Sequence, residues 1–128
     1  MLFRSQAVGD RPVQLVRGDF TRDGGRSAVV DLDELPDAIV CANDQTALGV
    51  LDVLASRGVP VPEKVQVTGY DGISAGRHSS PGLTTVHQPM SELGRAAVHL
   101  VIERLEHPER ARRAVTLPVR VVVRESTY

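Results

Sequence analysis

Residues 38–42 (AIVCA) form an uninterrupted apolar run, and this run constrains the fold more than any other feature of the sequence. Such a run is typical of a strand buried on both faces, as in a parallel sheet. A helical pattern follows at once, with Asn43 at the position of an N-cap and Asp44 in the first turn. Its apolar stripe consists of Ala47, Val50, Leu51 and Leu54.

Short apolar runs and helical patterns alternate along the rest of the chain. We expect further strands at 13–16, 65–68, 83–86 and 119–123, helices at about 24–35 and 90–107, and a loop or short irregular helix within 73–82. The fold class is therefore α/β, a mostly parallel sheet flanked by helices, in one unit over residues 1–128. In the last helix, the residues expected to face inward are Leu93, Ala97, Leu100, Val101 and Leu105.

The composition is that of an ordinary globular domain. The 128 residues are 41% hydrophobic and 24% charged, which excludes disorder and collagen-like or coiled-coil structure. No apolar run approaches the roughly 20 residues that cross a bilayer, and the N-terminus lacks a signal-peptide core, so we expect a cytoplasmic protein with no membrane partner. The net charge of −1 gives no general attraction to nucleic acid.

The sequence carries no enzyme motif. It contains no glycine-rich dinucleotide fingerprint, no P-loop and no serine nucleophile elbow. The single cysteine, Cys41, lies within the apolar run, so we expect an inert buried thiol, with neither a disulfide nor a cysteine metal site. The four histidines show no metal-ligand spacing. We therefore expect no catalytic residue, no metal and no cofactor.

Three expected strands end in side chains that suit a hydroxyl-rich ligand. In open parallel sheets, ligands bind outside the carboxyl ends of the strands. Asn43 and Asp71 can form paired polar contacts, and Phe20 offers an aromatic face. Each also fits a structural role: Asn43 as a helix cap, Asp71 as a turn residue bonded to its own backbone, and Phe20 as core.

Residues 42–49 (ANDQTALG) resemble the effector-binding domain of the lactose-repressor-type family of bacterial transcription regulators. Any one motif is weak, but seven in the family's order are specific, and the likeness covers nearly all of the chain from Val13 onward. The other matching segments are 18–21, 58–62, 67–71, 81–89, 93–97, and 117–118 together with 123–127.

The resemblance implies an incomplete periplasmic-binding-protein-like (type I) subdomain. In this family a sugar, nucleoside or similar small molecule binds between two subdomains and changes the geometry of a dimer, which alters operator affinity. By position, Phe20, Asn43 and Asp71 would bind the effector, with Gln88 at a crossover as a further candidate. The family's dimer contacts map onto a helix and a loop, at Ala47, Leu48, Leu51, Ser74 and Ser79.

The sequence departs from the family pattern in two ways. Gly72 stands where many members carry an acid or amide, so we expect one effector contact to be missing. By comparison with the family pattern, we expect the DNA-binding domain, the hinge and the first subdomain to lie outside this chain, and DNA contact to occur only through an N-terminal helix-turn-helix there. The helix at 90–107 packs on the first subdomain in complete relatives. Its apolar face is expected to be exposed here, as a candidate oligomer contact.

Two alternatives to a regulator remain open at this point. A sugar-binding protein of the related periplasmic transport type would share the architecture and the cleft. The missing signal peptide argues against it, although truncation could have removed one, and residues 43–45 and 83–85 resemble the regulators more closely. A small α/β enzyme is the other alternative, and Asp71 would be its first candidate residue.

Overall fold

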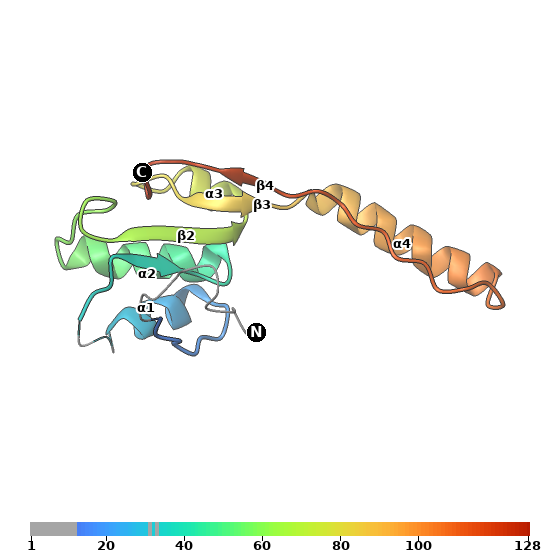
Figure 1. Ribbon diagram of the computed structural model, residues 1–128, viewed down its shortest axis with the longest axis horizontal. Helices are drawn as coiled ribbons and strands as arrows, with labels where there is room; N and C mark the ends of the chain where they lie inside the picture. The colour runs from blue at the N-terminus through green and yellow to red at the C-terminus, as the bar shows by residue number, and fades with distance from the viewer. Residues whose placement is uncertain (1–12, 31, 33) are drawn as a thin grey trace.

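The computed structural model describes residues 13–30, 32 and 34–128, and it contains one four-stranded sheet (Figure 1). The sheet order is β1 (Ala38–Val40), β2 (Gln66–Asp71), β3 (Thr84–His87) and β4 (Arg120–Val122). The first three strands run parallel, and β4 pairs with β3 in the antiparallel sense. The expected α/β class with a mostly parallel sheet is confirmed.

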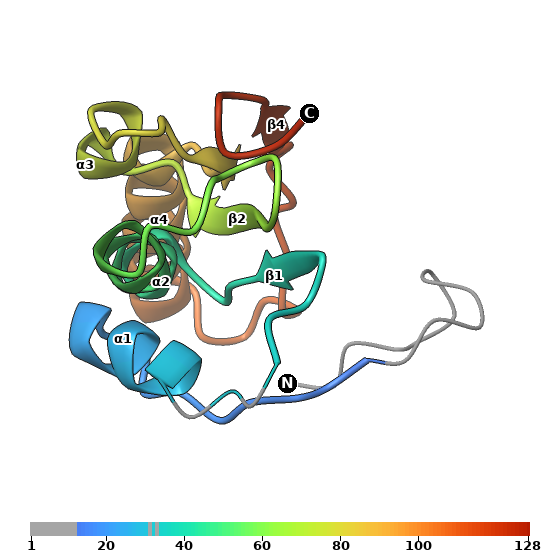
Figure 2. The ribbon, with the colours of Figure 1, turned by 90° about the vertical axis from the view of Figure 1, so that its left-hand side faces the viewer.

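Within the described residues, four helices accompany the sheet: α1 (Arg22–Val30), α2 (Asp44–Ser56), α3 (Ser74–Arg77) and α4 (Met90–Glu106). Figure 2 shows α2 and α3 against one face of the sheet, with α1 packed beside α2. Helix α4 leaves this body and extends as an arm, and the chain returns along it to β4 (Figure 1). In the described part of the chain, no helix is both long and apolar enough to cross a membrane.

The core lies between α2, α1 and the sheet. Helix α2 supplies half of it because its apolar residues recur at helical spacing and face both neighbours. Burying aliphatic side chains of this size stabilises the fold by roughly 1.5–3 kcal/mol each. The fully or nearly buried members are Val29, Cys41, Ala47, Leu48, Val50, Leu51, Leu54, Val65, Val67 and Leu83.

Two glycines bring α1 and α2 into backbone contact. A Cβ atom at Gly25 would overlap the carbonyl oxygen of Thr46, and a Cβ atom at Gly49 would overlap the carbonyl oxygen of Arg22. Only a residue without a side chain fits between helices that approach so closely. These glycines therefore set the spacing of α1 and α2.

Ion pairs beside this contact join the same two helices. The Asp52 carboxylate accepts hydrogen bonds from Arg22 Nε at 2.8 Å and Nη2 at 2.7 Å, and from Arg26 Nη2 at 2.7 Å. The bonds from Arg22, supported by those from Arg26, hold the pKa of Asp52 below its usual value in spite of partial burial. The arginine pKa values rise in return, chiefly through the hydrogen bonds to Asp52.

The strand expected at residues 13–16 is absent. The sheet ends at β1, whose one pairing partner in the described residues is β2, so this segment has no neighbouring strand. Leu15 is 70% exposed as a result. The expectation that residues 38–42 are buried on both faces is also wrong, because Ala38 and Val40 are exposed at this open end of the sheet.

Some element limits differ from those expected. The helix expected over 24–35 begins at Arg22 and ends at Val30. It starts earlier because the Thr21 hydroxyl accepts a hydrogen bond from the Gly24 N–H at 2.9 Å, as a helix cap does. Strand β2 runs to Asp71, beyond the expected end, because β3 offers pairing partners as far as His87.

Helix α4 contains no buried residue, contrary to the prediction that five of its residues face a core. Leu93 and Leu100 are half-buried, whereas Ala97, Val101 and Leu105 are exposed. The physical reason is that α4 projects from the body, so its apolar stripe has nothing larger than the returning chain beside it. The exposed apolar face that the family resemblance implied is present.

We predict that Gly49→Ala lowers the free energy of unfolding by about 1–3 kcal/mol, because the new methyl group must push α1 away. Gly94→Ala on α4 is the matched control. A Cβ atom there meets open space, so the substitution should leave stability unchanged or raise it. Urea denaturation of both variants measures the difference, and equal effects would contradict the close helix contact.

We also predict that the Asp52 ion pairs stabilise the protein only above acidic pH. The folded-state pKa is depressed, so the contribution is present above the unfolded value of about 3.9 and is lost as the pH falls through the folded value. The melting temperature of Asp52→Asn should lie below that of the wild type at neutral pH, and the two should converge on acidification. A gap that stays constant with pH would contradict this.

Candidate functional site

The candidate ligand-binding residues lie along one edge of the sheet. Asn43 follows β1, Asp71 ends β2, and Gln88 follows β3. Because these three strands are parallel, their carboxyl ends share an edge. Phe20 precedes α1 and joins the group through a hydrogen bond to Asn43.

Asn43 has two structural contacts. Its Oδ1 accepts a hydrogen bond from the Thr46 N–H at 2.9 Å and so caps α2, which confirms the N-cap expectation. Its Nδ2 donates to the Phe20 carbonyl oxygen at 2.9 Å. An amide group has four hydrogen-bonding positions, so one N–H and one lone pair remain for a ligand.

Phe20 does not belong to the core. It is 60% exposed, and its backbone has a φ of 66°, which is uncommon for a residue other than glycine. The preceding Asp19 accepts hydrogen bonds from the Thr21 hydroxyl at 2.7 Å and the Thr21 N–H at 2.9 Å. These two bonds lower the pKa of Asp19 and fix the turn that presents the ring.

Asp71 pairs with Gln88. The Gln88 Nε2 donates to Asp71 Oδ1 at 2.8 Å, and the Gln88 N–H donates to the Asp71 carbonyl oxygen at 3.1 Å. The two candidates therefore form one polar unit, and the second carboxylate oxygen is available to a ligand. The carboxylate accepts a hydrogen bond from the side chain of Gln88, which directly follows β3, and not from the backbone of its own turn.

Asp71 and Phe20 share an unusual backbone conformation. In the described part of the chain they are the two non-glycine residues with positive φ, 121° at Asp71 and 66° at Phe20. Such conformations are strained by roughly 1–3 kcal/mol each, persist only where the surroundings enforce them, and concentrate at functional sites. Two of the candidates chosen from the sequence thus have a backbone conformation of the kind that concentrates at functional sites.

Asp44 is a site residue whose inward contacts the sequence did not reveal. Its carboxylate is fully buried and accepts hydrogen bonds from the Gly72 N–H at 2.9 Å, the Ile73 N–H at 2.8 Å and the Thr85 hydroxyl at 2.5 Å. An acidic residue in the first turn of a helix is usually solvated, and no local pattern indicates that this one turns inward. Asp44 connects the Phe20–Asn43 pair to the Asp71–Gln88 pair.

Cys41 is a buried thiol, 7% exposed. Burial, with a smaller contribution from the nearby Asp44 charge, raises its pKa to about 12. The thiol is therefore protonated at neutral pH and unreactive, which agrees with the expected inert role. Among the residues that the structure describes, no group of three or more His, Cys, Asp and Glu side chains could hold a metal ion.

The residues assigned to a dimer contact divide into two groups. Ala47, Leu48 and Leu51 lie in the core, so their side chains pack within this chain, and their assignment to a dimer contact stays a prediction. The core role that periodicity alone gave them is the one observed. Ser74 is exposed, whereas the half-buried Ser79 hydroxyl lies 2.9 Å and 2.8 Å from two carbonyl oxygens of its own loop.

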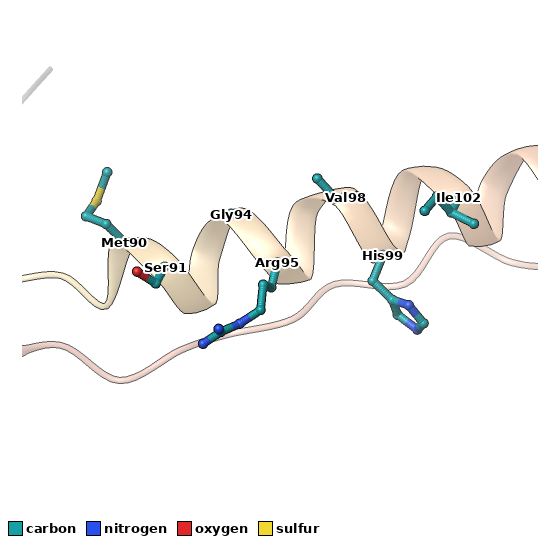
Figure 3. Close-up of a pocket in the computed structure, with 7 residues that line it drawn as sticks. All are labelled: Met90, Ser91, Gly94, Arg95, Val98, His99 and Ile102. Carbon is teal, nitrogen blue, oxygen red and sulfur yellow. The ribbon is translucent and has the colours of Figure 1, made fainter.

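A shallow depression of about 590 Å³ follows one face of α4 (Figure 3). Met90 and Val98 point to one side of the helix in this view, and Arg95 and His99 point to the other. None of the four candidate ligand-binding residues lines this depression.

An open α/β sheet with polar side chains gathered at the carboxyl ends of its strands is the architecture of a small-molecule-binding domain. The sequence matches the family model of the periplasmic binding protein-like domain over residues 2–127, and the chain belongs to this family.

Curated relatives are transcription repressors. The HTH-type transcriptional repressor PurR of Pasteurella multocida is 36% identical over 118 residues, which are 90% of this chain and 35% of the relative. The PurR repressor of Haemophilus influenzae is 40% identical over 101 residues, 77% of this chain and 30% of the relative. The chain thus spans about a third of the length of the curated relatives it matches.

Solved structures similar to this chain are also transcription regulators. A LacI family transcriptional regulator from Enterococcus faecalis, with bound ribose, matches with a TM-score of 0.83 and 32% identity, over 94% of this chain and 46% of that one. The complex of the transcriptional regulator CelR with cellobiose matches with a TM-score of 0.78 and 36% identity, over 85% of this chain and 34% of the CelR chain. The resemblance to effector-binding domains of lactose-repressor-type regulators is confirmed.

We predict that glycine at position 71 gives a more stable protein than alanine, the reverse of the order found at most positions. Asp71→Gly should be more stable than Asp71→Ala by about 1 kcal/mol or more, because only glycine adopts this φ without strain. Both variants lose the bond to Gln88, so their difference isolates the backbone. The same pair at exposed Asp37, which lacks a positive φ, is the control and should show no glycine advantage. Urea denaturation measures all four variants, and a more stable Asp71→Ala would contradict the strain.

Proposed function

We propose that this chain is the effector-sensing part of a bacterial transcription regulator of the repressor type. The observation that carries the proposal is a series of hydrogen bonds at the carboxyl ends of the strands. Asn43 bonds Phe20, the adjacent Asp44 bonds Gly72 next to Asp71, and Gln88 bonds Asp71. This series holds an aromatic face, an amide and a carboxylate in fixed relative positions.

This set of groups suits a sugar or a nucleoside. The free oxygen of Asp71 can accept a hydrogen bond from a ligand hydroxyl, and the remaining N–H of Asn43 can donate one. The exposed ring of Phe20 offers a face for the C–H side of a sugar or for a base. Ordered, partly strained groups lose little conformational freedom on binding, which favours affinity.

The relatives support a regulator over the transport alternative. Ribose and cellobiose are bound by the two regulators named above, and the curated relatives are named repressors. In the proposed protein, effector binding at this edge changes the operator affinity of the whole regulator, which contacts DNA through a helix-turn-helix and acts as a dimer. We infer a binding role and no catalysis, since the curated relatives are named transcription repressors.

The test is a titration of the isotope-labelled chain with D-ribose, cellobiose, adenosine and guanosine, followed by backbone amide NMR. We expect at least one of them to shift amides at residues 18–21, 43 and 70–73. Asp71→Asn should raise the Kd about tenfold or more, because a charged acceptor becomes a neutral one. Asp37→Asn, a carboxylate change just before β1 and so at the opposite end of the strands, should leave the Kd unchanged.

Two results would overturn the proposal. One is the absence of any shift at these residues with all four compounds at high millimolar concentration. The other is binding that Asp71→Asn and Asp37→Asn affect equally.

A further inference from the structure

The buried Asp44 carboxylate has a placement that its position in the sequence does not explain. We propose that Asp44 is the positioning residue of the ligand site: it holds Asp71 in its strained backbone conformation and so aims the Asp71 carboxylate at the ligand. This inference rests on the proposed function and names a residue that controls it without touching the ligand.

The hydrogen bonds of Asp44 act directly on the chain beside Asp71. One oxygen, Oδ2, accepts from the N–H groups of Gly72 and Ile73, the two residues that follow Asp71. Two adjacent N–H groups bound to one atom fix the orientation of both peptide planes. These two planes flank Gly72, so the bonds from α2 fix its φ of 78°. The peptide plane before Asp71 is held by the pairing of β2 with β3, so the plane after it, held by Asp44, sets the backbone of Asp71 at a φ of 121°.

The surroundings leave the carboxylate no other position. Its second oxygen, Oδ1, accepts from the Thr85 hydroxyl on β3. A Cβ atom at Gly69 would overlap this same oxygen, and one at Gly76 would come within 3.6 Å of Oδ2. The carboxylate thus sits in a space bounded by glycines of β2 and α3, and it is held by hydrogen bonds with no ion pair in the described part of the chain.

Asn43 and Asp44 divide the positioning of the site between them. Asn43 holds the carbonyl of Phe20, and Asp44 holds the chain after Asp71. Both stand at the start of α2, so one helix end sets the distance between the aromatic and the acidic part of the site. Loss of the Asp44 bonds should therefore release Asp71 while the Phe20–Asn43 pair stays in place.

The first experiment needs no ligand. In Asp44→Ala, and to a smaller degree in Asp44→Asn, the amides of Gly72 and Ile73 should exchange hydrogen faster than in the wild type, because a neutral amide oxygen accepts more weakly than a carboxylate. The Thr46 amide, which is bonded to Asn43, should keep its protection. Uniform acceleration of all three amides would overturn the proposal. If Asp44→Ala does not fold, the exchange rates of the same three amides in Asp44→Asn test the proposal.

The second experiment uses the ribose, cellobiose and nucleoside titration. Asp44→Ala should raise the Kd about tenfold or more, and Asp44→Asn, which keeps an acceptor oxygen, should recover part of the affinity. Thr85→Val is the matched control. It removes the third bond to the carboxylate and lowers stability, but it leaves Gly72 and Ile73 bonded, so the Kd should not change.

The outcomes separate the two proposals. If the wild type binds none of the probes, the proposed function fails, and the amide exchange still tests the positioning by Asp44. If the wild type binds and Asp44→Ala binds equally well, Asp44 is a structural residue only and the inference is wrong. An equal loss in Thr85→Val and Asp44→Ala would also overturn it, because the effect would then follow stability.

Discussion

The structure depends on one buried carboxylate. Asp44 joins the start of α2 to the loop after β2 and to β3, and a fully buried charge is tolerated only because three donors satisfy it. The hydrogen bonds of Asp44 fix one side of α2. The other side of α2 packs against α1, where Gly25 and Gly49 allow the two backbones to touch. Contacts with α2 therefore position the sheet, the core and the candidate ligand-binding residues relative to one another.

The features predicted correctly from the sequence depend on neighbours in the chain. The β1–α2 unit is local: an apolar run, an amide at the cap and a helical stripe are all visible within residues 38–56, and Asn43 caps α2 as expected. The direction of the Asp44 side chain is not local. Its partners lie 28, 29 and 41 residues away, and no spacing rule connects an acid in a first helical turn to them.

The errors have the same origin. Periodicity shows that residues 90–107 form a helix with an apolar face, but it does not show what covers that face, and here no core does. Likewise, residues 13–16 have the composition of a strand, yet a strand exists only beside another one. At the site, residue type and position after a strand indicated Phe20 and Asp71 as candidates, but no local pattern indicated the positive φ values that the structure shows at both.

The α4 arm and the rest of the molecule are expected to differ in their free energies of unfolding. Because none of its residues is buried, its helical turns can open without exposing Leu54, Val67 or the rest of the core. We therefore expect unfolding in two steps, with the arm melting locally at a small free-energy difference and the α1–α2–sheet body melting globally. A helicity signal and a signal from the core therefore report on different equilibria in the same protein.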